Sequence, residues 1–269
     1  MILKENNFIC PVCGSKTFDL GKSLRCFSGH SFDKAKEGYV NLLLKNASGK
    51  RHGDDKLMVE ARKSFLDKGY YAPLREKIGE VLKSGNVALD SGCGEGYYTS
   101  YFAENNTLLG IDISKDAVKA AAKRCKKATF AVASIAQIPV GDNSVDAVIN
   151  VFAPDSPKEF LRILKSGGRL ITAQPLENHL FELKQAIYDK PYKNPPLELE
   201  KDGFEIKSVN EVKYNITLES KEDIDALFKM TPYYYKTSAA DQQKLEKLNS
   251  LTVSLEFVVT EYVKITKCF

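Results

Sequence analysis

The sequence predicts an α/β fold, in which helices cover a mostly parallel sheet, preceded by a small metal-binding module. Two observations predict the α/β part: a glycine-rich loop directly after a short apolar run at 87–89, and a continued alternation of apolar runs with helical patterns. A third observation, the pattern C-x2-C-x12-C-x3-H near the N-terminus, predicts the module. The 269 residues are enough for one large domain and one small appendage.

The N-terminal module is expected to hold a metal ion. Its candidate ligands are Cys10, Cys13, Cys26 and His30. Three thiols and one imidazole in two tight turns suit tetrahedral Zn²⁺ with no open position, so the site should be structural. The alternative is a small core of reduced cysteines. We place this zinc-ribbon-like module at 1–45, a linker at 46–56 and the large domain at 57–269.

Positive charge is concentrated in the N-terminal segment. Residues 1–50 contain eight Lys/Arg and four Asp/Glu, which accounts for the net charge of +4 of the whole chain. This asymmetry indicates a module that meets an anionic partner. The candidate phosphate contacts are Lys34, Lys36, Lys50 and Arg51.

The composition also indicates a location. Three of the six cysteines cluster in the module and the others are scattered, which fits a reducing compartment better than a disulfide framework. No apolar run approaches the roughly 20 residues of a membrane span, and no signal-peptide pattern precedes the module. We therefore expect a cytoplasmic protein without a membrane partner.

The large domain begins with two helical patterns, at 54–68 and 72–82, followed by the glycine-rich loop. Its glycines let the backbone turn tightly and approach a ligand, and the following helix offers free N–H groups. The candidate cofactor residues here are Asp90, Gly92, Gly94, Glu95 and Gly96. Asp112 ends the next apolar run, where a carboxylate can take both ribose hydroxyls. The spacing G-x-G-x-G resembles motif I of class I S-adenosylmethionine (AdoMet) methyltransferases, which have a Rossmann-like fold.

The alternation continues to the C-terminus. We predict strands at 108–112, 129–133, 145–152 and 169–174, with helices at 115–126, 157–164 and 179–190. The segments 204–216 and 251–265 should be antiparallel closing strands, with a helix at 221–228 between them. The cofactor should lie over the carboxyl ends of the parallel strands, where Ser134 and Ile135 are placed to contact its adenine.

Three strings of residues together resemble one family. They are C-P-V-C, then G-H-S-F-D-K-A-K-E-G-Y-V-N-L-L from residue 29, then D-S-G-C-G-E-G-Y-Y-T from residue 90. They resemble the bacterial 23S rRNA (guanine-N1)-methyltransferases over essentially the whole chain. The resemblance implies methyl transfer from AdoMet to N1 of a guanine in a hairpin loop of 23S rRNA, with structural Zn²⁺ and a homodimer. It also implies that Tyr71 and His179 contact the cofactor.

The residues that handle the target atom stay open at this stage. The segment after 145–152 lacks the [D/N]-P-P-[Y/F/W] box of enzymes that methylate exocyclic amines. Methylation of cytosine C5 needs a nucleophilic cysteine beside a proline, and neither Cys125 nor Cys268 has that neighbour, so a ring nitrogen remains permitted. Asp155 is the candidate for the proton acceptor, and the peptide carbonyls at 152–154 are an alternative group that would guide the edge of the base. The three tyrosines at 233–235 either stack a splayed base or pack a loop.

Two other functions compete with rRNA methylation. The first is an AdoMet-dependent methyltransferase with zinc that acts on another RNA or on a small molecule. The second is a non-catalytic RNA-binding module with a vestigial cofactor pocket. The zinc module and its positive charge argue against a small-molecule enzyme, and the intact glycine loop with Asp112 argues against a decayed pocket.

Overall fold

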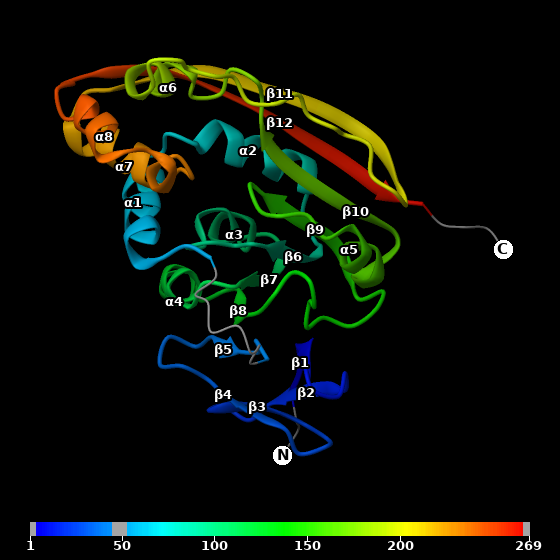
Figure 1. Cartoon of the computed structure of the whole chain (residues 1–269). Coiled ribbons are helices and arrows are strands. Elements are labelled where there is room, and N and C mark those ends of the chain that lie inside the picture. The colour runs from blue at the N-terminus through cyan, green and yellow to red at the C-terminus, as the bar shows by residue number, and fades with distance from the viewer. Residues whose placement is uncertain (1–3, 45–52, 266–269) are drawn as a thin grey trace.

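The computed structural model describes residues 4–44 and 53–265, which form two sheets (Figure 1). The predicted linker at 46–56 lies largely outside the described residues, as do Lys50 and Arg51. The small sheet is antiparallel in the order β1-β2-β3-β4. Its strands are β1 (Lys4–Ile9), β2 (Lys16–Asp19), β3 (Ser23–Cys26) and β4 (Ser31–Asp33).

The large sheet has the order β11-β12-β10-β9-β6-β7-β8-β5. Its strands are β5 (Val40–Asn41), β6 (Val87–Ser91), β7 (Thr107–Asp112), β8 (Thr129–Val132), β9 (Val145–Val151), β10 (Leu164–Pro175), β11 (Phe204–Leu218) and β12 (Leu251–Lys264). The six strands from β5 to β10 are parallel, and β12 joins both β10 and β11 antiparallel. This arrangement confirms the predicted Rossmann-like sheet with an antiparallel closing hairpin.

The helices agree with the predicted positions, apart from two short elements that the sequence did not predict. The predicted helices are α1 (Lys56–Asp67), α2 (Ala72–Leu82), α3 (Tyr97–Phe102), α4 (Lys115–Arg124), α5 (Pro157–Ile163), α6 (Phe181–Ile187) and α7 (Lys221–Lys229). The two further elements are the 3₁₀ turn Tyr234–Lys236 and α8 (Ala239–Leu245). Side-chain caps from Asp55 and Ser114 fix the starts of α1 and α4. Among the described residues, no helix is long and apolar enough to cross a membrane.

Alternating residues of the central strands point to opposite faces of the sheet and belong to two different hydrophobic cores. On β6, for example, Ala88 belongs to one core and Leu89 to the other. The first core packs the sheet against α1, α2, α4, α6 and α7. The second packs it against α5 and against Phe8 and Leu24 of the zinc module. The module is therefore part of the core of the large domain.

Strand β5 joins the last part of the predicted module to the large sheet. Val40 pairs with Ala131 of β8, and the N–H of Leu42 donates to the carbonyl of Val132 (2.9 Å). The last residues of the predicted module thus extend the large sheet at its edge. Pairing of β8 with β5 covers a row of backbone groups that would otherwise be exposed.

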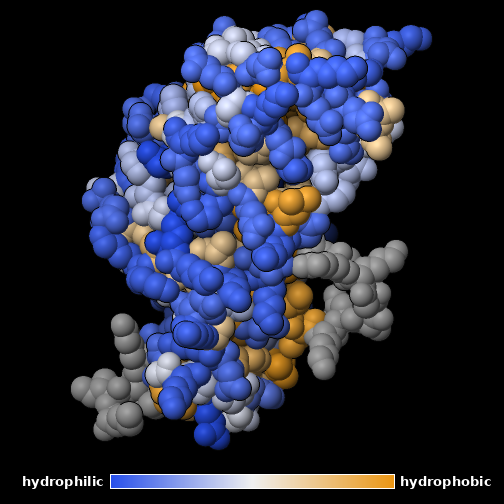
Figure 2. Space-filling model, turned by 90° about the vertical axis from the view of Figure 1, so that its left-hand side faces the viewer, coloured by the Kyte–Doolittle hydropathy of each residue, from blue (hydrophilic) through white to orange (hydrophobic). Residues whose placement is uncertain are grey.

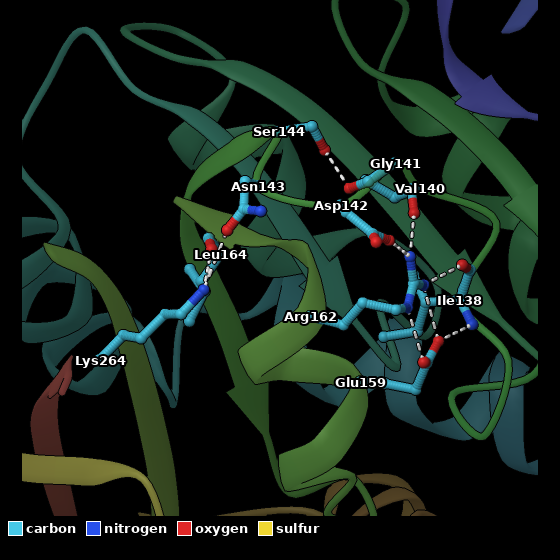
Figure 3. A network of polar contacts seen from close by, with 10 residues as sticks. All are labelled: Ile138, Val140, Gly141, Asp142, Asn143, Ser144, Glu159, Arg162, Leu164 and Lys264. Carbon is cyan, nitrogen blue, oxygen red and sulfur yellow. Dashed lines mark hydrogen bonds and ion pairs between the residues drawn. The ribbon is translucent and has the colours of Figure 1, made fainter. Parts of the chain in front are cut away.

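The module also docks on the loop between β8 and β9. Ile9 donates its N–H to the carbonyl of Pro139 (2.9 Å), and Phe8 forms a β-bridge with Val140. Arg162 of α5 holds this loop, because its Nη atoms donate to the carbonyls of Ile138 and Val140, each at 2.8 Å (Figure 3). Paired charges on Asp142 and Glu159 fix the guanidinium, at 2.7 and 2.8 Å. The docking loop is therefore tied to α5 by the hydrogen bonds of one half-buried arginine.

Candidate functional site

A cavity of about 700 Å³ lies at the carboxyl ends of the parallel strands. Most of the predicted cofactor residues line it, namely Tyr71, Gly92, Gly94, Glu95, Asp112, Ser134, Ile135 and His179. Asp90 and Gly96 are not part of the lining. A volume of this size falls within the range of ligand pockets, ~300–1,000 Å³. The structure thus brings together residues that are more than a hundred positions apart in sequence.

The three glycines of the loop serve different purposes. A Cβ on Gly92 would lie 2.4 Å from the Cβ of Ala153, and one on Gly96 would lie 2.9 Å from Ala121. These two glycines allow close packing of the loop against its neighbours. A Cβ on Gly94 would have only Arg62 near it, at 3.7 Å, so this glycine presents open backbone to the cavity. All three have a positive φ, which L side chains rarely adopt.

The two predicted aspartates, Asp90 and Asp112, have different roles. The carboxylate of Asp112 accepts the N–H groups of Gly94 (3.0 Å) and Ser114 (2.8 Å), which fixes it at the edge of the cavity. Asp90 lies beneath the loop and accepts the hydroxyl of Thr99 (2.5 Å). Burial raises the pKa of Asp90 to about 7. Asp90 therefore ties α3 to β6, whereas Asp112 is placed to meet a ligand.

Several buried polar groups at the cavity lack partners among the described residues. Glu95 is 2% exposed and pairs with Arg124 (2.7 Å), but its Oε1 has no hydrogen-bond partner. The hydroxyls of Tyr97 and Tyr98, which also line the cavity, have none. Buried polar atoms are normally satisfied, so these groups fit a polar ligand such as the AdoMet amino acid or ribose.

An aromatic cluster forms one wall of the cavity. His179 packs against Phe257 with ring centroids 4.5 Å apart, and Tyr71 packs against Phe257 at 5.0 Å. The Nδ1 of His179 accepts the N–H of Glu256 (3.3 Å), and burial lowers the pKa of this histidine to about 3. The imidazole is therefore neutral with its proton on Nε2, where it can donate but cannot act as a base.

Segments outside the glycine loop also close the cavity, and sequence reasoning missed one of their residues, Arg62. Arg62 of α1 is the only Lys or Arg in the described part of the lining. Its guanidinium pairs with Asp54 and donates to the carbonyl of Met230 (3.3 Å). Residues 230–233, including Tyr233, form part of the rim, whereas Tyr235 donates to Asp55 away from the lining. No local pattern marks a single arginine on a charged helix as a ligand contact.

Asp155, the predicted proton acceptor, does not line the cavity. It lies in a neighbouring open groove beside α5 and forms an ion pair with Lys201. This placement counts against the predicted role, because the carboxylate is held by another partner outside the pocket. Phe152, Ala153 and Pro154, whose carbonyls are the alternative, do line the cavity. The amide of Asn150 fixes their turn by donating to the carbonyl of Pro154 (2.8 Å).

The predicted zinc ligands converge at one point. The donor atoms of Cys10, Cys13, Cys26 and His30 all lie within 4.8 Å of one another. Tetrahedral zinc with bonds of ~2.3 Å to sulfur and ~2.0 Å to nitrogen requires edges of about 3.8 Å and about 3.5 Å. The observed separations are 3.8 Å for Cys13 to Cys26 and 3.4 Å for Cys26 to His30 Nδ1. The four side chains thus have the geometry of a closed structural Zn²⁺ site.

Comparisons with known proteins agree with both parts of the chain. Residues 8–46 match the family model described as "RlmA, N-terminal", a zinc ribbon, and residues 89–172 match a methyltransferase domain. A Bacillus subtilis (strain 168) protein with the provisional name 23S rRNA (guanine-N(1)-)-methyltransferase is 33% identical over 93% of this chain and 94% of its own length. The 23S rRNA (guanine(748)-N(1))-methyltransferase of Streptomyces fradiae is 37% identical over 66% of each chain.

Solved structures support the fold alone. The [4+2]-cyclase SpnF superposes with a TM-score of 0.53 at 18% identity, over 78% of this chain and 93% of that one. Such a match identifies the sheet and its helices. A shared fold does not fix the reaction, which must be argued from the site.

Proposed function

Because the chain belongs to the 23S rRNA (guanine-N1)-methyltransferase family, we propose that it methylates N1 of a guanine in a hairpin loop of 23S rRNA. AdoMet and structural Zn²⁺ are its cofactors. One observation carries the proposal: the cavity lined by the motif I loop belongs to a domain whose hydrophobic core also includes residues of the zinc ribbon. The family match leaves little support for the small-molecule enzyme or for the vestigial pocket.

In this proposal, four residues of the lining hold the cofactor. Asp112 accepts the ribose hydroxyls, and the open backbone of Gly94 allows close approach. Ile135 contacts the adenine. Arg62 pairs with the carboxylate of the methionine part, because it is the only Lys or Arg in the described lining. AdoMet would supply a methyl carbon made electrophilic by its sulfonium, so the protein mainly positions the base for transfer and for loss of the N1 proton.

The target nitrogen carries a proton that must leave during transfer. N1 lies on the Watson–Crick edge, so the guanine has to be unpaired or flipped out. The neutral His179 is unsuitable as the acceptor, because its only free nitrogen bears the hydrogen. We assign the N1–H contact to the carbonyls of the 152–154 turn, whose residues line the cavity, rather than to Asp155. A peptide carbonyl accepts a hydrogen bond but is too weak a base to take the proton, so these carbonyls orient the N1–H edge and the proton is released to solvent.

The zinc module is the proposed RNA reader. Lys34 is already paired with Asp19 (2.5 Å), so the outer face of β2 and β3 offers a better surface. Arg25 lies opposite Phe18 in the register, and Phe27 packs on Phe18 at 4.6 Å while 77% exposed. An exposed aromatic beside a cation suits a stacked base next to a phosphate. Phe27→Ala and Arg25→Ala should weaken RNA binding and leave AdoMet binding unchanged.

Two further features belong to the proposal. A homodimer, implied by the family resemblance, would use the outer edge of β11, a 15-residue strand with exposed Ile206 and Val209. Sedimentation velocity of the wild type and of Val209→Lys tests this assembly. A cytoplasmic location follows from the rRNA substrate.

The deciding experiment is mass spectrometry of 23S rRNA fragments from cells with and without the gene. A guanine that gains 14 Da at N1 only in the presence of the gene supports the function. The same fragments should be methylated by purified protein and AdoMet. If the purified protein binds AdoMet but methylates none of these RNA fragments, the proposed function is contradicted.

A further inference from the structure

Two non-glycine residues of the cavity lining have left-handed backbone, Phe152 (φ 54°) and Leu180 (φ 57°). Leu180 is 2% exposed, so its side chain is accounted for by core packing. Phe152 is 44% exposed, although it is an aromatic residue in a conformation that large side chains rarely adopt. Backbone preference does not explain this residue at this position, and packing covers only part of its ring.

The strained turn is held from both sides. The N–H of Phe152 donates to the carbonyl of Ala173 (3.1 Å), which continues the pairing of β9 with β10. The buried amide of Asn150 donates to the carbonyl of Pro154 (2.8 Å). Across the turn, Gly92 leaves space for the methyl group of Ala153. A strained conformation persists only when its surroundings impose it, and such positions concentrate at functional sites.

The ring of Phe152 is supported on one side and open on the other. Its centroid lies 5.6 Å from that of Phe257 and 6.2 Å from that of Tyr71, both of which are buried. The rest of the ring faces the cavity and solvent at the end of β9. The result is a rigid aromatic surface beside the carbonyls of 152–154.

We propose that Phe152 is the platform on which the target guanine stacks when it leaves the RNA. The inference rests on the proposed function. The base would lie against the exposed ring, and the adjacent carbonyls of the turn would meet its N1–H edge. Stacking on an aromatic ring is the common way in which proteins bind an unpaired RNA base. The strained φ is then the means by which β9 directs the ring into the cavity.

The test compares Phe152→Leu with Phe152→Tyr, which keeps the ring. We expect Phe152→Leu to lose about 10- to 100-fold in kcat/KM on an rRNA hairpin, the effect of one lost base stack. Phe152→Tyr should stay near the wild type. The calorimetric Kd for AdoMet should change less than twofold in both variants. Tyr101→Leu, which removes an exposed ring on α3 outside the cavity lining, is the matched control and should behave like the wild type.

A fluorescent base reports stacking without turnover. A hairpin with 2-aminopurine in place of the target guanine should be quenched on binding to the wild type and to Phe152→Tyr, and should stay bright with Phe152→Leu. If Phe152→Leu is not folded, Phe152→Asn replaces it, because asparagine tolerates a positive φ.

Each contrary outcome is distinguishable. Full activity of Phe152→Leu, or a bright 2-aminopurine signal with the wild type, overturns the platform. A loss of AdoMet affinity as large as the loss of rate assigns the ring to the cofactor and also overturns it. Absence of guanine methylation by the wild type refutes the proposed function instead.

Discussion

Separate replacement of Gly92 and Gly94 by alanine should distinguish the two uses of glycine in one loop. Both residues have a positive φ, 80° and 53°, which costs an alanine ~1–2 kcal/mol relative to glycine. Gly92 carries a second cost, because its new Cβ would lie 2.4 Å from the Cβ of Ala153. Overpacking of this kind costs ~1–3 kcal/mol. We therefore expect Gly92→Ala to lose ~2–5 kcal/mol of stability and Gly94→Ala ~1–2 kcal/mol.

For AdoMet affinity, we expect the larger loss in Gly94→Ala, the variant that loses less stability. The Cβ of Gly94→Ala meets little protein and projects into the cavity, so AdoMet affinity should fall while most of the stability remains. Urea unfolding measures the stability, and calorimetry measures the AdoMet Kd. In a thermal melt, each kcal/mol should lower Tm by ~2–4 °C for a chain of this size.

A double variant isolates the steric part. Adding Ala153→Gly to Gly92→Ala removes the clashing methyl group, so the overpacking cost should be recovered and the cost of the positive φ should remain. Equal destabilisation by both single variants, with no recovery in the double variant, would refute the packing argument. Unchanged AdoMet affinity in Gly94→Ala would mean that the cofactor does not approach this backbone.

Three other predictions test separate parts of the molecule. Purified protein should carry one zinc per chain by atomic absorption, and chelation should lower the Tm of the whole chain, because the module shares a core with the large domain. Asp90, whose folded pKa is raised to about 7, should make stability fall as pH rises from about 4 to about 7, since only the folded state still holds the proton there. The isosteric Asp90→Asn should lose this slope in urea titrations, and an unchanged slope would contradict the assignment. Arg62→Ala should weaken AdoMet binding in calorimetry but leave 5′-methylthioadenosine binding unchanged, because that analogue lacks the carboxylate; equal losses for both ligands would assign Arg62 a structural role.

The sequence predicted the elements whose signals are local. Strands β6 and β7, with Gly94 and Asp112 at their ends, follow from apolar runs and glycine spacing within a few residues. The zinc ligands follow from spacing in the same way. In each case the partners are close in sequence, so their geometry is implied by the motif itself.

The contributions that depend on distant segments were not predictable. Strand β5 has only two residues, and its role depends on β8, so nothing near Val40 indicates an edge strand. Arg62 and Phe257 reach the cavity region from segments before and after the glycine loop, and each is an ordinary residue in its own element. Asp155 shows the same dependence, because its position after β9 follows from the sequence, whereas its place in the neighbouring groove depends on Lys201.

The pairing of β5 with β8 sets an order on assembly during translation. The zinc ligands lie within the first thirty residues, so a nascent chain can load metal soon after they emerge from the ribosome. Val40 can pair with β8 only after Ala131 has been synthesised. The aromatic cluster at the cavity is complete only when Phe257 on the last strand has been added. A chain that stalls before β12 would therefore hold zinc without a complete cofactor cavity, so metal content and AdoMet affinity should report different stages of synthesis.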